Sequence, residues 1–307
     1  MFDFDVFVDN ITSPSIIGLA INYFPLGARY MVLSAIGFAL MGALVKLCSA
    51  EGIPVMEIVA ARAIVSLVLS TLDIKRKRLS LLGKQQLWLF IRGAVGTLAL
   101  ICIYYALTVL PFAEATVLQY LHPAFTAIMA IIFLGERVHR STFMCIFLSM
   151  VGLLLIVRPA FLFGMASADF SATAIVAAIT GALGSAIAYI LVRKLSATED
   201  PSVIIFYFPL VALPIALLIL GDDFVMPEGH QWLLLIGIGV TTQIGQIGLT
   251  KSMQTETASK ATSYAYLQVV FAALLGWLVF SEVPGVWTGV GGALIIAGAA
   301  INMLWKR

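Results

Sequence analysis

One charged side chain stands in the middle of a long apolar segment. Arg62 lies within residues 54–72, roughly 10 Å from either end of a helix of that length. A charge at that depth in a bilayer costs about 2.5–3.5 kcal/mol even on the lenient insertion scale, so the side chain must face protein or water. It is either a counter-ion for an anionic substrate group or a structural donor to helix-end carbonyls or a carboxylate.

Polar side chains also share one face of the segment 113–134, where steps of three, three and four residues bring them to one side of a helix. They are Thr116, Gln119, His122 and Thr126, and Tyr120 and Pro123 flank them. Such a face either lines a cavity or supplies hydrogen bonds between helices. His122 could act in proton coupling or be an ordinary hydrogen-bonded histidine. Pro123 removes a backbone hydrogen bond and could kink the helix, which makes it a gating candidate.

Further polar groups recur at helical spacing in four other apolar segments. Amide and phenol groups suit the recognition of amino and carboxyl groups, although ordinary packing is the alternative for each tyrosine. The additional substrate-binding candidates are Thr97, Tyr104, Ser185, Tyr189, Gln243, Gln246, Tyr264 and Gln268.

Charged residues near the segment ends have simpler explanations. Lys46 and Glu57 are either a gate pair or solvated residues, and Lys46 is retained as a gating candidate. Glu136 is expected to stabilise the N-terminus of the helix that begins near Thr142.

The composition is that of a protein whose natural solvent is lipid. Of 307 residues, 61% are hydrophobic and only 11% are charged. A soluble domain carries roughly 25% charged residues, because its surface must stay hydrated. The net charge of +2 gives no reason to expect nucleic acid as a partner. Cys48, Cys102 and Cys145 show no ligand spacing, so no metal or other cofactor is predicted.

Apolar runs of roughly 17–23 residues recur along the chain, close to the roughly 20 residues that cross a hydrocarbon core. Lipid offers no partner to an unpaired backbone group, so these runs must be helices. The sequence therefore predicts an all-α membrane protein of ten transmembrane helices. The predicted spans are 29–47, 54–72, 87–108, 113–134, 141–157, 171–193, 202–220, 230–250, 258–280 and 285–305.

Lysine and arginine set the predicted orientation. The connection after the second span carries Lys75–Arg78 and Lys84, and such basic loops stay cytoplasmic. Both chain ends then lie in the cytoplasm, in a multi-pass protein of the cell's inner or plasma membrane. Most other basic residues, including Arg92, fall on the same side, and the exceptions are Lys46 and Arg158.

The chain contains a second copy of itself. Residues 91–157 meet 237–303 without a gap when they are shifted by 146 positions. Five spans in each half force the second half to enter the membrane upside down, and such inverted repeats hold substrate at their interface near mid-membrane. The predicted organisation is a cytoplasmic or interfacial segment 1–28, a five-helix repeat 29–157, a linker 158–170 and a second five-helix repeat 171–307, around a central cavity.

Glycine is dense in several spans, and small residues let helix backbones approach closely. In the last span Gly285 and Gly289 form a GxxxG pattern, which predicts tight packing of that face.

Short motifs around the fourth and fifth spans carry a family resemblance. The run His122–Thr126 reads HPAFT, FLGER follows at Phe133–Arg137, and Val157–Pro159 reads VRP. This pattern resembles the EamA type of the drug/metabolite transporter superfamily, over essentially the whole chain after about residue 29. The resemblance implies ten helices in a five-plus-five inverted repeat, and it specifies fold better than substrate. Val269 stands where a second copy of Pro123 would be, so gating by the two halves is not expected to be equivalent.

The most direct function is secondary transport of a small metabolite by alternating access. Arg62 and the inward polar groups favour an anionic or zwitterionic solute, such as an amino acid or an organic acid. The chain has no GxxxxGK[ST] pattern for ATP hydrolysis. A membrane enzyme would need paired acids, HExxH or GxSxG, and a channel would need a filter or a charged ring. No such pattern is visible, and the prediction is that the chain is not an enzyme.

The expected partners are a small-molecule substrate and the lipid bilayer. The sequence leaves open a coupling proton or a counter-solute, and it leaves open a homodimer. The identity of the substrate and the direction of transport are not readable from the residues.

Overall fold

The computed structural model describes residues 25–159, residue 162 and residues 171–305. The predicted N-terminal segment 1–28 and linker 158–170 lie almost entirely outside these residues.

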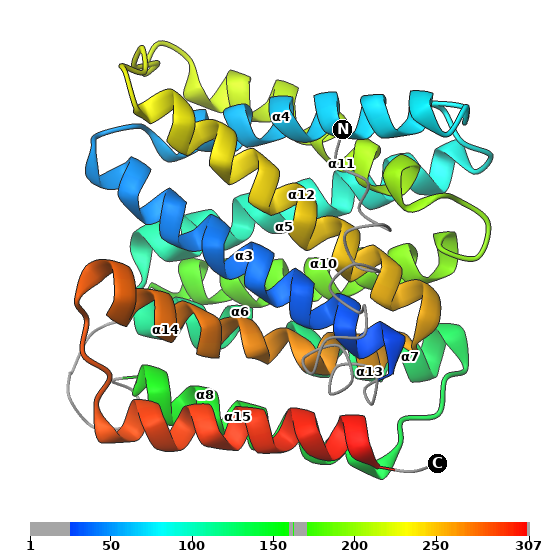
Figure 1. The fold of residues 1–307 in the computed structure, drawn as a ribbon, viewed down its shortest axis with the longest axis vertical. Helices are drawn as coiled ribbons and strands as arrows, with labels where there is room; N and C mark the ends of the chain where they lie inside the picture. Colours follow the sequence, from blue (N-terminus) through cyan, green and yellow to red (C-terminus); the bar gives the residue numbers. More distant parts are fainter. Residues whose placement is uncertain (1–24, 160–161, 163–170, 306–307) are drawn as a thin grey trace, which may run out of the picture.

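The described residues hold ten segments that are long and apolar enough to cross a membrane, and each coincides with a predicted span. The prediction of an all-helical, ten-span membrane fold is confirmed (Figure 1). The helices are α3 (Leu26–Ala50), α4 (Val55–Arg76), α5 (Gln86–Val109), α6 (Phe112–Gln119), α7 (His122–Leu134), α8 (Arg140–Val157), α10 (Ala172–Leu195), α11 (Pro201–Leu220), α12 (Gln231–Thr255), α13 (Ala258–Ser263), the 3₁₀ turn η1 (Tyr264–Tyr266), α14 (Leu267–Phe280) and α15 (Val286–Leu304).

The outer surface of the bundle is apolar, as lipid requires. Large side chains such as Phe143, Leu218 and Leu233 are mostly exposed, and Leu218 keeps 81% of its surface uncovered. Exposure on this scale would be unfavourable in water because apolar surface is driven together there. The interior instead holds many small residues, which lets the helices pack closely.

Two of the spanning segments are broken near their middle. The fourth span divides between α6 and α7 at Tyr120 and Leu121, and Pro123 at the start of α7 has no N–H to continue the ladder. The ninth span divides at η1 although Val269 replaces the proline there. The break in the second half therefore does not require a proline, and packing must hold it.

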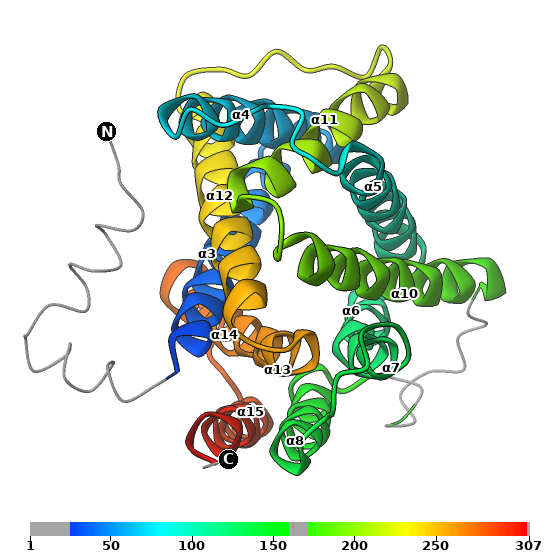
Figure 2. The ribbon, with the colours of Figure 1, turned by 90° about the vertical axis from the view of Figure 1, so that its right-hand side faces the viewer.

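Helix pairs from the two halves form the body of the bundle (Figure 2). Helix α3 packs along α12, and its counterpart α10 packs along α5. Helix α4 packs along α11, and α8 packs along α15 at one side of the molecule. Exchanging each helix for its counterpart in the other half reproduces the same set of pairs, as two equivalent halves would require.

Close backbone contact occurs at glycines, but not at the predicted GxxxG face. A Cβ added to Gly37 on α3 would lie 2.8 Å from the backbone nitrogen of Gly245 on α12. A Cβ added to Gly285 or Gly289 would meet nothing within 4 Å in the described chain. The prediction of tight packing at Gly285 and Gly289 is therefore wrong for the described chain. Gly291, on the opposite face of α15, approaches Gly152 of α8 instead.

Candidate substrate site

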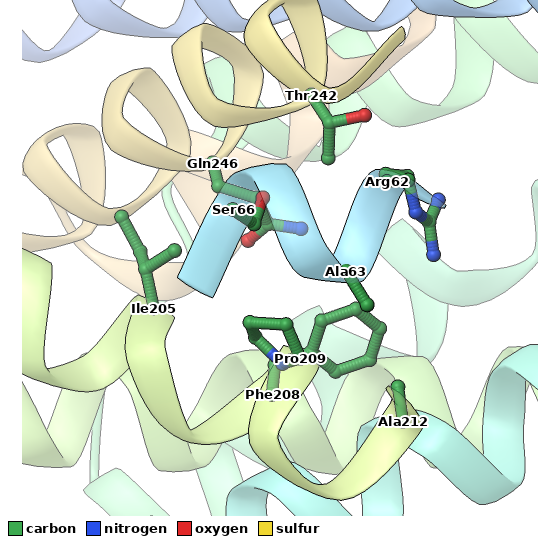
Figure 3. A pocket seen from close by; sticks show the side chains of 9 residues that line it. All are labelled: Arg62, Ala63, Ser66, Ile205, Phe208, Pro209, Ala212, Thr242 and Gln246. Atoms are coloured by element: carbon green, nitrogen blue, oxygen red, sulfur yellow. The ribbon is translucent and has the colours of Figure 1, made fainter. Parts of the chain in front are cut away.

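Arg62 lies where α4 meets α11 and α12, beside a small cavity (Figure 3). It is buried, its Nη1 lies 3.8 Å from Met41 Sδ, and its guanidinium carbon lies 5.9 Å from the centre of the Phe208 ring. The cavity measures about 10 Å³, which is room for roughly one water molecule. It is lined by Arg62, Ala63, Ser66, Ile205, Phe208, Pro209, Ala212, Thr242 and Gln246.

The partners of Arg62 in the described residues are a sulfur atom and an aromatic ring. Within residues 25–159 and 171–305 it bonds neither to a carboxylate nor to a helix-end carbonyl. A thioether and an aromatic face are weak partners for a buried cation. The arginine is therefore held in place without being neutralised by the part of the protein that is described.

Arg92 is a second buried arginine beside the same aromatic ring. Only 3% of its surface is exposed, and its guanidinium carbon lies 5.2 Å from the centre of the Phe208 ring. Its Nη2 donates to Gln246 Oε1 at 3.4 Å, whereas Nε and Nη1 have no hydrogen-bond partner among the described residues. The orientation prediction counted Arg92 with the basic residues of the cytoplasmic side; α5 begins at Gln86 and turns this side chain into the bundle, where it is buried.

The polar strip predicted on α12 faces the bundle interior. Gln243 Nε2 donates to Ser70 Oγ on α4 at 2.9 Å, and Gln243 Oε1 has no partner in the described chain. One helical turn later, Gln246 reaches the cavity and Arg92. Gln243 therefore ties α12 to α4, and Gln246 is free to contact the contents of the cavity.

An aromatic cluster surrounds the break in the fourth span. The ring of His122 lies 5.3 Å from that of Tyr189 on α10 and 5.9 Å from that of Tyr120. Tyr120 stacks on Tyr266 of η1 at 5.7 Å, and the Tyr266 hydroxyl donates to the Tyr120 carbonyl at 2.9 Å. The two broken spans therefore meet at their breaks, where freed backbone groups find partners.

This cluster lies near Arg92, the second buried arginine. Tyr189 lies within electrostatic range of Arg92. His122 Nδ1 has no hydrogen-bond partner among the residues described. Three predicted site residues, Tyr120, His122 and Tyr189, are thus brought together.

The remaining predicted site residues are scattered. Three hydroxyl groups, those of Thr97, Thr116 and Ser185, donate to the carbonyl four residues earlier in their own helix. Thr97 and Tyr104 line a separate cavity of about 10 Å³ between α4, α5 and α11. Tyr264 is fully buried, with no hydrogen-bond partner for its hydroxyl in the described residues. Gln119 and Gln268 are half-buried next to the breaks.

Charged contacts join the helices at one end of the bundle, called the basic end because it holds the α4–α5 connection, residues 77–85. Glu136 Oε1 lies 3.2 Å from Arg193 Nε, and the Glu136 carboxylate accepts from the backbone N–H of Ala258 at 2.9 and 3.1 Å. Arg193 Nη1 also donates to the Met253 carbonyl at 2.6 Å. Glu136 therefore stabilises the N-terminus of α13 and not that of the helix near Thr142, because its carboxylate accepts from the backbone N–H of Ala258.

A second group of charges at the basic end surrounds Lys77. Its Nζ lies 2.8 Å from Asp73 and 3.1 Å from Asp200. Burial acts to lower the pKa of Lys77, but its hydrogen bond to Asp73 and the charge of Asp200 outweigh that effect and raise the pKa above its usual value. Beside it opens a polar pocket of about 440 Å³, lined in part by Ser196, Asp200 and Lys251.

The opposite end of the bundle, called the far end, has looser contacts. Lys46 forms an ion pair with Glu282 and lies 4.3 Å from the centre of the Phe280 ring. Glu57 accepts from the backbone N–H of Val225 at 2.9 Å. The suggested pairing of Lys46 with Glu57 is therefore wrong, because the α14–α15 turn brings Glu282 to Lys46.

A family model described as the EamA-like transporter family matches this chain twice, at residues 25–158 and 172–304. The chain belongs to the EamA-like transporter family. The family resemblance of the sequence motifs is thereby confirmed, and the chain is an integral, multi-pass membrane transporter.

Relatives of this EamA-like transporter bear transporter names. It is 35% identical to the pseudopaline exporter CntI of Pseudomonas aeruginosa, over 88% of this chain and 93% of that protein. It is 34% identical to solute carrier family 35 member G1 of Mus musculus, over 92% of this chain and 79% of that protein. It is 27% identical to a riboflavin transporter of Vibrio cholerae, over 94% of this chain and 96% of that protein. A crystal structure of a protein shares the fold with a TM-score of 0.73, at 20% identity over 89% of this chain and 96% of that chain.

Sequence reasoning missed or misassigned several residues of the candidate site in this EamA-like transporter. Arg92 carried the same signal as Arg62, a charge inside an apolar run, and could have been recognised by it. Phe208 follows Arg62 by 146 positions, the offset of the repeat, but an apolar residue in an apolar span gives no signal of its own. Glu136 could not be assigned to α13 because that contact joins residues 122 positions apart.

Proposed function

We propose that this chain is a secondary transporter that moves a small anionic or zwitterionic solute, such as an amino acid or an organic acid, by alternating access. The observation that carries the proposal is Arg62, a buried cation that no described carboxylate neutralises, beside a cavity between α4, α11 and α12. A charge kept in the membrane interior at this cost has a functional role by default. The negative group of a bound solute is the partner that the site lacks.

The small size of the cavity fits one stage of an alternating-access cycle. A volume of about 10 Å³ is too small for an amino acid, so the described conformation holds the site closed. Separation of α4 and α11 would enlarge it, because the two helices border it from opposite sides (Figure 3). The two family matches, at residues 25–158 and 172–304, support a repeat of residues 29–157 in residues 171–307.

The ion pairs at the two ends are the proposed gates. The Glu136–Arg193 pair closes the basic end against α13, and the Lys46–Glu282 pair closes the far end. In alternating access, one gate opens while the other stays closed. The proposed site extends toward the basic end through the aromatic cluster of Tyr120, His122 and Tyr189. Tyr120 and His122 belong to the broken fourth span and Tyr189 to α10, and in the proposed cycle these two segments move against each other.

The proposed topology places the basic end in the cytoplasm. Lys75 and Arg76 end α4 and Lys84 lies in the α4–α5 connection there, in agreement with the rule that basic loops stay inside. Both chain ends would then be cytoplasmic, in the cell's inner or plasma membrane.

Uptake by proteoliposomes tests the proposal. Labelled glutamate, succinate and phenylalanine are offered to vesicles that carry the wild-type protein, Arg62→Ala, Arg62→Lys or Arg140→Ala. Saturable uptake with counterflow by the wild type and by Arg140→Ala, at the exposed start of α8, together with its loss in Arg62→Ala, supports a carrier with Arg62 as counter-ion. Unsaturable flux would indicate a pore, and unchanged affinity in a folded Arg62→Ala would contradict the role of Arg62.

A further inference from the structure

Two buried guanidinium groups share one aromatic ring in the centre of this bundle. Arg62 on α4 and Arg92 on α5 lie 5.9 Å and 5.2 Å from the centre of the Phe208 ring, measured from each guanidinium carbon. Phe208 comes from a third helix, α11, and lines the cavity. The three helices therefore bring two positive charges to one place from distant parts of the sequence.

The protein supplies these cations with few partners of its own. Arg92 Nε and Nη1 lack any hydrogen-bond partner among the described residues, and the remaining nitrogen makes a long contact of 3.4 Å to Gln246. Arg62 contacts a methionine sulfur. A guanidinium offers five donors in a planar fork that fits a carboxylate with two parallel bonds. The open donors of Arg92 have the chemistry that such a ligand requires.

Charge balance gives the second argument. In the part of the chain that is described, no carboxylate forms an ion pair with Arg62 or Arg92. Two uncompensated cations within one bundle interior repel each other and lose their hydration. A bound ligand with one negative charge would neutralise only one of the two guanidinium groups. A ligand with two negative groups would balance both.

We propose that Arg92 is a second substrate-binding residue, and that the substrate carries two anionic groups, one for Arg62 and one for Arg92. This inference rests on the proposed function and narrows its substrate class from any small anion or zwitterion to a dianion of the dicarboxylate type. The Phe208 ring, whose centre lies 5.9 Å and 5.2 Å from the two guanidinium carbons, would pack against the carbon skeleton between the two carboxylates. Gln246 lines the cavity, contacts Arg92 and offers its amide to the same ligand.

Binding to the purified protein in lipid nanodiscs tests the inference. The probes are succinate and glutarate, each with two carboxylates, and butyrate and phenylalanine, which carry fewer net negative charges. The readout is the concentration that half-saturates a shift in thermal unfolding temperature. The wild type is expected to bind the dicarboxylates about tenfold or more tightly than butyrate, because each carboxylate gains its own charged partner. Equal affinity for succinate and butyrate would overturn the proposal without any variant.

Variants at Arg92 make the assignment specific. Arg92→Gln keeps a polar side chain and removes one charge, so succinate affinity should fall about tenfold or more while butyrate affinity changes little. Arg92→Lys should keep much of the succinate affinity because it keeps the charge. Arg140→Ala, which leaves the interior untouched, should match the wild type. An equal loss for succinate and butyrate in a folded Arg92→Gln would show a structural role only.

The outcomes separate this inference from the proposed function. Saturable transport of butyrate or phenylalanine that depends on Arg62 but not on Arg92 would overturn the dianion assignment and leave the carrier intact. Absence of saturable transport or binding for the anionic and the zwitterionic probes alike would remove the proposed function, and this inference with it.

Discussion

Glu136 and Glu282 stand 146 positions apart, at matching places in the two halves, and each forms an ion pair with a basic residue of the other half at opposite ends of the bundle. The two pairs are not equally tight. The Glu136 side chain is 9% exposed and also binds the N-terminus of α13, whereas the Glu282 side chain is 59% exposed. Two halves with the same sequence pattern thus adopt different contacts, as expected when one gate is more firmly closed than the other.

Loss of the Glu136 carboxylate is expected to loosen the basic end. Glu136→Gln keeps the shape but weakens the charge-assisted bonds to Arg193 and Ala258, each worth about 1.5–3 kcal/mol. A cysteine placed at the buried Ser259, in a background without the native cysteines, should react with a thiol reagent several-fold faster in this variant because α13 opens more often.

Glu282→Gln is the matched control for this measurement, because it removes the equivalent carboxylate at the far end. It should leave the labelling rate at Ser259→Cys unchanged or lower it, because a looser far end favours the conformation in which the basic end is closed. Equal acceleration by both variants would mean that the two ends do not act as separate gates.

The Lys46–Glu282 pair is expected to contribute little to stability and more to gating. Both side chains are more than half exposed, and exposed ion pairs contribute about 0–1 kcal/mol. Lys46→Glu places two negative charges together and should lower transport, whereas the double exchange Lys46→Glu with Glu282→Lys should restore it. Uptake by proteoliposomes measures both, and failure of the exchange to rescue a folded protein would argue against a gate at this pair.

The spans could be predicted from the sequence because each depends on local composition alone. A run near 20 apolar residues must be a helix in lipid, whatever it later packs against. Arg62 was found by the same logic, since a charge stands out against an apolar background. Polar residues spaced three or four positions apart could be assigned to one face of a helix, and Gln243 and Gln246 indeed face inward.

The partners of these residues could not be predicted because they come from distant segments. Arg92 meets Gln246 across 154 positions, and Tyr266 meets Tyr120 across 146. Thr116 and Ser185 had the right spacing, but a hydroxyl can satisfy itself on its own helix, and both do. Helical spacing therefore predicts on which face of a helix a residue lies. The packed structure decides whether its polar group has a hydrogen bond still available for a ligand.

Removal of Pro123 is expected to leave the helix break in place. The ninth span breaks at the corresponding position without a proline, so contacts such as that between Tyr266 and Tyr120 hold both breaks. Pro123→Ala should therefore fold and retain at least about half of wild-type transport, since packing and not ring geometry fixes the site. Uptake and unfolding temperature are the measurements, with Val269→Ala in the second half as control. Complete loss of transport in a folded Pro123→Ala would show that the proline itself is part of the gate.

The contact between α8 and α15 gives a paired test of the packing. A Cβ at Gly291 would press on Gly152 and Ile156 of α8, whereas a Cβ at Gly289 would meet nothing within 4 Å in the described chain. Alanine favours helix over glycine by about 1 kcal/mol at either position, so only the contact differs. Gly291→Ala should destabilise the protein by about 1–3 kcal/mol because two helix backbones must move apart, and Gly289→Ala should leave stability unchanged or raise it. The unfolding temperatures of the two purified variants decide the matter: if they shift alike, α8 and α15 do not pack through Gly152 and Gly291 in the membrane.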